Sequence, residues 1–367
     1  MTNGGGTLSV RTLSDVESDA LASERWQFVA LNAGDVYYQL PYLEAASIHE
    51  EGNVFLCHFS HPQGEVLYPL VLRPLSQLPF TPDALLDSYD AITPYEYGGP
   101  LVHAQDGAAA EVLRKAFDQE FIAFCRSEGI VCEFVRFHPL LRTHEGWDSA
   151  YEIRHSCANV IIDLTKTQDE IVAACTPLNR RNLRTAQRRN IAITKVDRST
   201  ANVQVFADLY MATMDRLGAS PRYYFSREYF EKLCQGADQW ISLYLAIDGE
   251  GTTLSGALVI HGSEFAHYHL GGTAPDVSRY RPNNLLYHTI AMDQKLAGRQ
   301  YFHLGGAASS QEGLLAFKAG FSRARINYQV GWRIHDQQAY ASLSDAWTRT
   351  SLNSVRRNSD SFPAYRA

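Results

Sequence analysis

The chain contains 367 residues, of which 45% are hydrophobic and 20% are charged, and its formal net charge is −7. This composition is typical of a soluble globular protein, and the length favours two domains of ordinary size or one large one. No apolar run reaches the roughly 20 residues of a membrane span, the N-terminus lacks the layout of a secretory signal, and the acidic balance argues against nucleic-acid binding over the whole surface. We therefore expect a cytoplasmic protein.

The first half of the chain alternates helical and extended patterns after a short lead, residues 1–6, that we expect to be disordered. Leu113, Phe117 and Phe121 lie on one face at helical spacing, and residues 61–64 form a turn signal that joins two strands into a hairpin. We expect helices at 15–32 and 108–126, a short helix after residue 42, strands at 53–59, 65–73 and 130–137, and a loop from 74 to 92.

The second half opens with a strand pattern and a helix start. Thr167 and Glu170 make a capping box, and Pro177 kinks or splits the helix that follows. Pro282 and Gly298 bracket a later helix with the usual asymmetry, and Leu285, Met292 and Leu296 form its expected apolar stripe. We expect helices at 167–190, 203–217, 227–235, 283–297 and 313–319, and strands at 159–164, 191–196, 241–247, 253–261, 265–270, 301–304 and 326–334.

One local pattern occurs twice. A tyrosine is followed three residues later by two glycines at positions 95–99 and again at 268–272, and each copy precedes a long helical pattern and a short apolar strand. Similar order and spacing predict two related modules. The predicted fold class is therefore α/β with a mixed sheet, in two modules around a shared cleft where a ligand binds.

Basic residues are concentrated between positions 180 and 198, where Asp197 is the lone acid. They are Arg180, Arg181, Arg184, Arg188, Arg189, Lys195 and Arg198. Such a cluster in an acidic chain predicts a site for phosphate groups. A solvated helix face, with several arginines paired to acids elsewhere, is the alternative.

The six cysteines are expected to be free thiols. None forms a CxxC pair, and no two have the spacing of zinc ligands, so we expect no metal site. They are Cys57, Cys125, Cys132, Cys157, Cys175 and Cys234.

A succession of motifs covers the second half. In order they are residues 179–182 (Asn179-Arg180-Arg181-Asn182), Tyr210 with Thr213 and Arg216, Tyr229-Phe230, residues 268–272, residues 282–286, residues 301–306 and residues 313–321. The chain resembles the Fem-type peptidyltransferase family, a branch of the GNAT acyltransferase superfamily, over residues 30 to 335. The resemblance implies two GNAT-like domains, at 10–155 (completed by about 322–340) and at 156–321, followed by a C-terminal tail at 341–367.

The resemblance also implies a reaction. Members of the family move an amino acid from aminoacyl-tRNA onto an amine of a peptidoglycan precursor, and relatives act in natural-product pathways. This chain departs from the family pattern, because residues 37–46 contain no lysine and His303 stands where an aspartate is usual. The absence of a Q/R-x-x-G-x-G/A loop disfavours an acyl-CoA donor, and the arginine cluster favours RNA. The expected tRNA contacts are Arg180, Arg181, Arg184 and Arg188.

The chemistry is attack of an amine on an activated ester, without a covalent enzyme intermediate, because no nucleophile motif is visible. Lys318 is the main catalytic candidate, as a cation for an oxyanion or a phosphate, and Tyr268 and His269 follow. The alternative for Lys318 is a surface lysine without a role in the site, and for Tyr268 and His269 it is a structural residue of a strand. The expected substrate-binding residues are Arg216, Arg222, Tyr223, Tyr229, Gly271, Gly272, Asn283 and His303.

Two other functions stay open. One is an acyl-CoA-dependent N-acyltransferase that acts on an amino sugar or an amino acid. The other is a GNAT-like module without catalytic activity that binds a peptidoglycan or polysaccharide precursor. In the enzyme readings, aminoacyl-tRNA or acyl-CoA is a co-substrate and no further cofactor is expected.

Overall fold

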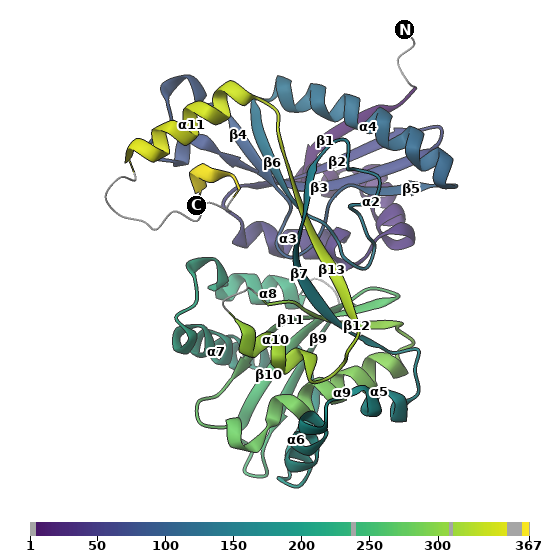
Figure 1. Cartoon of the computed structure of the whole chain (residues 1–367), viewed down its shortest axis with the longest axis vertical. Helices are drawn as coiled ribbons and strands as arrows, with labels where there is room; N and C mark the ends of the chain where they lie inside the picture. The colour runs from purple at the N-terminus through teal and green to yellow at the C-terminus, as the bar shows by residue number, and fades with distance from the viewer. Residues whose placement is uncertain (1–4, 236–239, 308–310, 351–361, 367) are drawn as a thin grey trace. The chain divides into compact units, whose positions relative to one another are not determined.

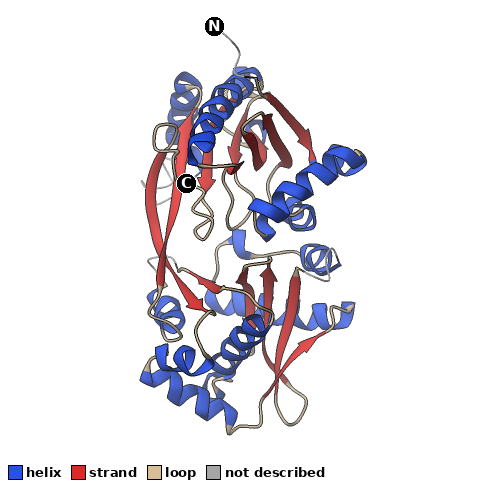
Figure 2. Ribbon diagram, turned by 90° about the vertical axis from the view of Figure 1, so that its right-hand side faces the viewer, coloured by secondary structure: helices blue, strands red, loops and turns tan. Residues whose placement is uncertain are grey.

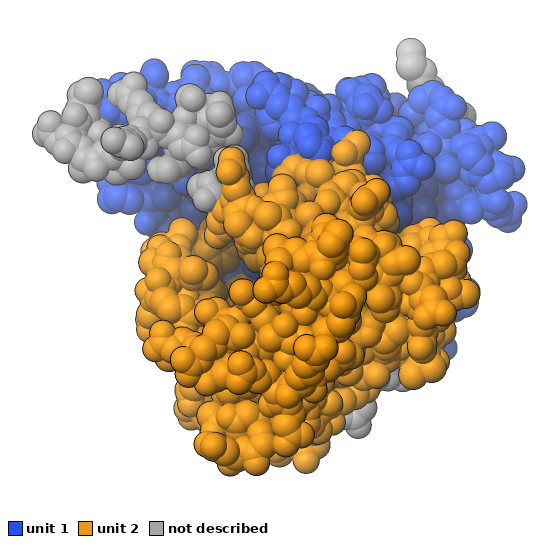
Figure 3. All heavy atoms as spheres, turned by 60° about the horizontal axis from the view of Figure 1, so that its bottom comes forward, with its two compact units in different colours: residues 1–156, 329–367 blue, residues 157–328 orange. Residues whose placement is uncertain are grey.

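The structure, a computed structural model, describes residues 5–235, 240–307, 311–350 and 362–366. The chain forms two compact units, which Figure 3 shows in different colours. Unit 1 comprises Met1–Ser156 and Gln329–Ala367, and unit 2 comprises Cys157–Tyr328. The chain therefore leaves unit 1, builds unit 2 and then returns to unit 1.

Unit 1 is a mixed sheet with helices on its faces (Figure 1). Helix α4 (Gly107–Ser127) has the predicted apolar face, since Leu113, Phe117 and Phe121 are buried. Asp106 caps its start by accepting the Ala109 N–H at 2.8 Å. The elements are β1 (Thr7–Thr12), α1 (Leu13–Ser18), α2 (Ala20–Ala33), α3 (Leu40–His49), β2 (Asn53–His61), β3 (Gly64–Pro74), β4 (Tyr89–Ile92), β5 (Leu101–Ala104), α4 (Gly107–Ser127), β6 (Ile130–Arg136), β13 (Arg325–Ile334) and α11 (Gln337–Thr350).

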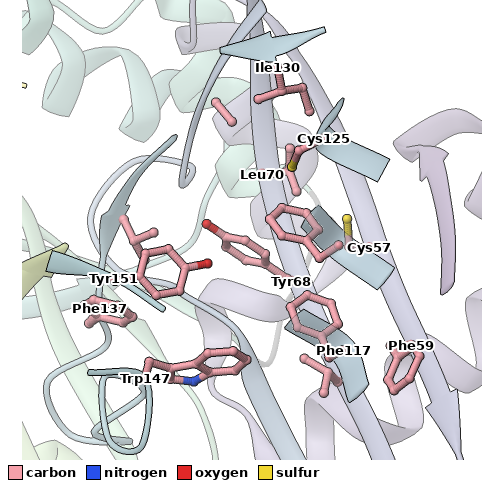
Figure 4. Packing of buried hydrophobic residues seen from close by; sticks show 14 of the residues in the cluster. Cys57, Phe59, Tyr68, Leu70, Phe117, Cys125, Ile130, Phe137, Trp147 and Tyr151 are labelled. Carbon is pink, nitrogen blue, oxygen red and sulfur yellow. The ribbon is translucent and has the colours of Figure 1, made fainter. Parts of the chain in front are cut away.

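The two faces of the unit 1 sheet carry different helices. On β2, Cys57 and Phe59 belong to the core cluster that includes residues of α4. The neighbouring Leu56 and His58 instead line a pocket with Trp26 of α2. This alternation is what a strand with two covered faces requires. Figure 4 shows the rings on the α4 side, which include Tyr68, Phe117, Trp147 and Tyr151.

Unit 2 is also built from strands and helices that alternate along the chain. The capping box at Thr167 is present, and Pro177 splits the predicted long helix into α5 and α6. The elements are β7 (Glu152–Asp163), α5 (Gln168–Ala174), α6 (Pro177–Gln187), β8 (Ala192–Val196), α7 (Thr200–Leu217), α8 (Arg227–Gln235), β9 (Ile241–Ile247), β10 (Thr253–His261), β11 (Phe265–Thr273), α9 (Pro282–Leu296), β12 (Tyr301–Gly305) and α10 (Glu312–Ala319).

The two units share one strand order. In unit 1 the order is β1-β2-β3-β4-β6-β13, and in unit 2 it is β8-β9-β10-β11-β12-β7. Each has four antiparallel strands, a fifth parallel to the fourth, and a sixth antiparallel to the fifth. The sixth strand of each sheet comes from a remote part of the sequence, and Figure 2 shows these strands in red. The predicted duplication and the α/β mixed-sheet class are confirmed.

In unit 2, helix α9 covers one face of the sheet and α7 the other. Ala257 and Val259 of β10 share a core cluster with Ile290 of α9. On the opposite face, a Cβ at Gly256 would contact Phe206 of α7. Side chains on β11 therefore face either α9 or α7, and this decides what each can reach.

Some expectations about local structure are wrong. β4 lies within the stretch that was expected to be a loop, and no expectation covered β1, which begins at Thr7, or β5. Most of the expected disordered lead, residues 1–4, lies outside the described residues. The tail predicted at 341–367 begins inside α11, which buries Leu343 completely because Ala339, Leu343 and Ala346 face the sheet at helical spacing. Leu296, assigned to the apolar stripe of α9, is 78% exposed. The six cysteines are free, as predicted.

Candidate active site in unit 2

The site is positioned by the parallel strands β11 and β12. Their register pairs Phe265 to His267 with Tyr301 to His303, and the pairing ends there although β11 continues to Thr273. Opposite β10 the register shifts so that His269 has no Cα partner, which is a β-bulge. The carboxyl ends of the two strands therefore separate, and bulges of this kind commonly redirect side chains next to functional sites.

Lys318 lies at the end of this opening. It comes from α10, is only 8% exposed, and its Nζ donates to the carbonyl oxygen of Gly306 at 2.6 Å. Gly306 directly follows β12. A buried ammonium group held beside a strand end can stabilise an anion there, because low polarity strengthens the interaction. The alternative, a surface lysine, is excluded.

Two histidines meet across the paired ends of the strands. His303 Nδ1 and His267 Nδ1 are 3.1 Å apart, and His303 Nε2 is 2.9 Å from Asn159 Nδ2 on β7. All three side chains are buried. Because both ring nitrogens of His303 have protein partners, His303 is suited to hold its neighbours in place and not to contact a substrate directly.

His269, the bulge residue, contacts Tyr229 of α8, which belongs to a group of packed aromatic rings with Phe225. Its Nε2 is 2.7 Å from the hydroxyl oxygen of Tyr229, and both residues are buried. Tyr229 in turn packs on Phe225 with ring centroids 4.5 Å apart. The structure thus brings two predicted site residues together on the α8 side of the sheet.

Tyr268 lies on the opposite face, toward α9. Its ring stacks on Tyr287 with centroids 4.3 Å apart, and a Cβ at Gly271 would collide with its hydroxyl. Burial raises the pKa of Tyr268 to about 12, despite the opposing effect of a hydrogen bond with Tyr287. Tyr268 therefore keeps its proton at neutral pH and serves mainly to pack β11 on α9.

The glycine end of β11 is held by backbone contacts. A Cβ at Gly272 would collide with the α7 backbone, which explains a glycine in this strand. Arg216 Nη1 donates to the Thr273 carbonyl at 3.0 Å, and Asn283 Nδ2 donates to Thr273 Oγ1 at 2.9 Å. Arg216 and Asn283 thus join the end of β11 to α7 and α9.

Arg222 and Tyr223 form a separate surface pair. Arg222 Nη2 donates to the Tyr223 hydroxyl at 2.8 Å, and the guanidinium carbon lies 4.8 Å from the ring centroid. Their backbone is anchored by Tyr210, whose hydroxyl donates to the Tyr223 carbonyl at 2.8 Å. No contact in the described parts of unit 2 joins this pair to Lys318.

The arginines of α6 divide into two groups. Arg180 donates to the carbonyl oxygens of Ala173 and Cys175 and so closes the end of α5. Exposed members of the cluster form no ion pair with any residue that the structure describes. Among them are three arginines of α6 and its C-terminal end, Arg181, Arg184 and Arg188.

The basic face of α6 extends to the start of α9. Arg189 lies 5.6 Å and Arg279 4.7 Å from the ring centroid of Tyr280, and Arg279 Nη2 donates to the Tyr280 hydroxyl at 2.6 Å. Arg281 is the N-cap residue of α9, where no described side chain caps the free N–H groups. Arginines and an uncapped helix start together favour bound phosphate.

The sequence indicated neither Asn159 nor His267 as a catalytic or substrate-binding residue. Both depend on strand register, since β7 reaches His303 only through antiparallel pairing with β12. The remaining site residues stay predictions, with Lys318, His303, Tyr229 and His269 gathered near the ends of β11 and β12. None of the helices in the described ranges is long and apolar enough to cross a membrane.

Comparison with known proteins identifies a domain within unit 2. Residues 179–319 match the family described as Acetyltransferase (GNAT) domain. No curated protein matches the sequence. Among solved structures, FemX has 15% identity and a TM-score of 0.63, and the match covers 91% of this chain and 99% of that one.

Two further solved structures are similar. L-PGS from Bacillus licheniformis has 11% identity and a TM-score of 0.54, with 90% of this chain and 95% of that chain covered. The C-terminal domain of a putative lysylphosphatidylglycerol synthetase from Agrobacterium fabrum has 17% identity and a TM-score of 0.51, with 91% and 98% covered. At these identities the likeness establishes the fold. Residues 179–319 therefore form an acetyltransferase (GNAT) domain, and the chain as a whole has the fold of two GNAT-like units that FemX shows.

Proposed function

We propose that the protein forms an amide bond by aminoacyl transfer, with aminoacyl-tRNA as the donor and a small amine as the acceptor. The observation that carries this proposal is the exposed arginine face of α6, which continues through Arg189, Tyr280 and Arg279 to the start of α9. A row of guanidinium groups that form no ion pair with a described residue suits a nucleic-acid backbone, because phosphate contacts supply most of such affinity. The Fem-like fold agrees with this donor.

The reaction balances without an enzyme-bound intermediate. The neutral amine attacks the ester carbonyl, a C–N bond forms, the C–O bond to the tRNA ribose breaks, and the amine proton ends on the released ribose hydroxyl. Negative charge develops on the carbonyl oxygen in the transition state. Lys318, buried beside the Gly306 carbonyl, supplies a cation for that oxygen.

The acceptor is expected to be an amine of a peptidoglycan precursor or of a natural product. Its nitrogen must approach from the side of the sheet that carries His267, His269 and Tyr229, because Tyr268 and Tyr287 fill the α9 side of β11. Aromatic and imidazole groups on that face suit a polar acceptor with a ring or a peptide plane.

A binding experiment tests the donor. Charge reversal of Arg184 and Arg188 to Glu should weaken binding of total aminoacyl-tRNA and flatten its salt dependence, since each lost phosphate contact removes about 0.7–0.9 from the slope of log K against log salt. Arg126→Glu on α4 of unit 1 is the matched control, because it changes an equally exposed arginine. Unchanged affinity and slope in the double variant would contradict an RNA donor.

Acyl-CoA is the second candidate donor, since the family match is to an acetyltransferase domain. Against it, the connection from Ala274 to Arg281 contains no glycine, whereas a pyrophosphate loop needs close backbone approach. Calorimetry with acetyl-CoA separates the two donors. Saturable CoA binding together with transfer that resists RNase would replace the tRNA proposal.

A further inference from the structure

Four buried or half-buried side chains of unit 2 form one hydrogen-bonded chain. Cys157 Sγ lies 3.4 Å from Asn159 Oδ1, Asn159 Nδ2 lies 2.9 Å from His303 Nε2, and His303 Nδ1 lies 3.1 Å from His267 Nδ1. Asn159 is fully buried, and His267 and His303 are each 1% exposed. This series of hydrogen bonds crosses β7, β12 and β11, which are the strands that frame the opening.

The chemistry of the four side chains determines which atom donates and which accepts in each of these hydrogen bonds. A thiol can donate to Oδ1, which orients the Asn159 amide so that Nδ2 faces His303. An amide nitrogen only donates, so His303 Nε2 must accept. In a neutral imidazole the proton is then on Nδ1, which donates to His267 Nδ1, and the His267 proton is therefore on Nε2. If His303 carried a second proton, its Nε2–H would face the N–H donor of Asn159 Nδ2, so that two donors would meet without an acceptor.

The same asparagine supports the turn that receives Lys318. Gly306 packs so closely against Asn159 and Cys157 that a Cβ would collide with Asn159 Oδ1 and Cys157 Sγ. The carbonyl of that glycine accepts the Lys318 ammonium at 2.6 Å. One buried amide thus sets the position of the cation and the proton positions of both histidines.

We propose that Asn159 is a positioning residue of the acyl-transfer site, which holds the Gly306 turn for Lys318 and fixes His303 and His267 in one pair of tautomers. The role in transfer rests on the proposed function. The tautomers do not, because they follow from the distances and from the orientation of the Asn159 amide. Asn159 serves the reaction through other residues and does not itself contact the reacting atoms.

Nitrogen-15 NMR of the full chain labelled at histidine tests the proton positions without any substrate. His303→Gln and His267→Gln identify the two signals. We expect His303 with a protonated Nδ1 and a bare Nε2, and His267 with a bare Nδ1 and a protonated Nε2. A protonated Nε2 on His303 would overturn the proposal, whatever the activity of the protein.

Asn159→Asp tests the role in transfer, because it keeps the shape of the side chain and replaces the donor by an acceptor. We expect His303 Nε2 to gain a proton and kcat to fall at least tenfold, with KM for the amine changed less than threefold. Asn53→Asp, at an exposed position of β2, is the matched control. Full kcat in Asn159→Asp, or unchanged histidine signals, would refute the positioning role.

Failure of the proposed function gives a different pattern. If the wild-type chain shows the predicted tautomers but transfers no aminoacyl group, then the hydrogen-bond chain stands and the donor or the reaction is wrong. If Asn159→Asp does not fold, the wild-type spectrum still decides the first claim, and Asn159→Ser, which keeps a donor in a smaller side chain, takes its place in the kinetic test.

Discussion

Glu133 of β6 offers a sharp test of how the returning strand β13 is held in unit 1. Its carboxylate is completely buried, and it accepts hydrogen bonds from Arg333 Nε at 2.9 Å, Arg333 Nη2 at 2.8 Å and the Tyr68 hydroxyl at 2.9 Å. Burial alone would raise the pKa of Glu133. The charge of Arg333 and the hydrogen bond from His335 outweigh that effect and lower the pKa to about 2.

The magnitude follows from linkage between protonation and folding. A pKa lowered from an ordinary 4.5 to about 2 corresponds to about 3 kcal/mol of stabilisation at neutral pH. This contribution is fully present above pH 4.5 and is lost as the pH falls from 4.5 through about 2. Arg333→Met leaves a buried carboxylate without its partner, for which the usual cost is about 3–5 kcal/mol.

Urea unfolding of the wild type and Arg333→Met, at pH 7 and at pH 2.5, measures both effects. We expect Arg333→Met to lower the free energy of unfolding by at least 3 kcal/mol at pH 7. The loss should be much smaller at pH 2.5, because Glu133 of the variant is then protonated and no buried charge is left without its partner. Arg154→Met is the control, because the Arg154–Glu152 pair is exposed and its loss should cost about 1 kcal/mol or less. A loss below 1 kcal/mol for Arg333→Met, or one independent of pH, would refute the reasoning.

Three further variants test other parts of the account. Leu343→Ala should lower the free energy of unfolding by about 2–5 kcal/mol, measured with urea, because the Leu343 side chain of α11 is fully buried. An unchanged free energy of unfolding would show that α11 does not contribute to the core of unit 1. Gly272→Ala should lower the melting temperature and the transfer rate together, since α7 must move away from β11, and a variant with wild-type values for both would contradict the contact. Burial and the nearby charges of Arg25 and Arg11 lower the pKa of His58 to about 4, against the opposing effect of Glu65, whose Oε2 lies 2.7 Å from His58 Nε2. Folding stability should therefore fall between pH 6.5 and pH 4, and His58→Gln should flatten that dependence. An equally steep profile in the variant would exclude His58 as its source.

Local chemistry made much of the fold predictable. The capping box at Thr167 and the proline and glycine that bracket α9 are signals within one turn of a helix, and each marks its element correctly. The paired glycines near Tyr95 and Tyr268 mark corresponding places in the two units, because each pair precedes the helix that connects two parallel strands. Apolar spacing at Ala339, Leu343 and Ala346 was also present and could have revealed α11.

The site depends on relations that no local pattern contains. His267 and His303 are neighbours because β11 and β12 run parallel in one register, and Asn159 joins them because β7 pairs antiparallel with β12. The first half of β7 is polar and exposed, so its sequence gives little strand signal. Lys318 was recognisable from its motif, but its burial against the Gly306 carbonyl was not.

Lys318→Met tests the central claim most directly. The measurement is the rate of transfer of radiolabelled amino acids from total charged tRNA to a pool of lysine-containing stem peptides and amino sugars, with RNase-treated donor as the blank and the melting temperature recorded for both proteins. We expect RNase-sensitive transfer by the wild type and a fall of about 100-fold or more in kcat for the variant, the scale of losing one oxyanion donor. Full activity of Lys318→Met in a folded protein would contradict the assignment of Lys318 and, with it, the placement of the active site at the ends of β11 and β12.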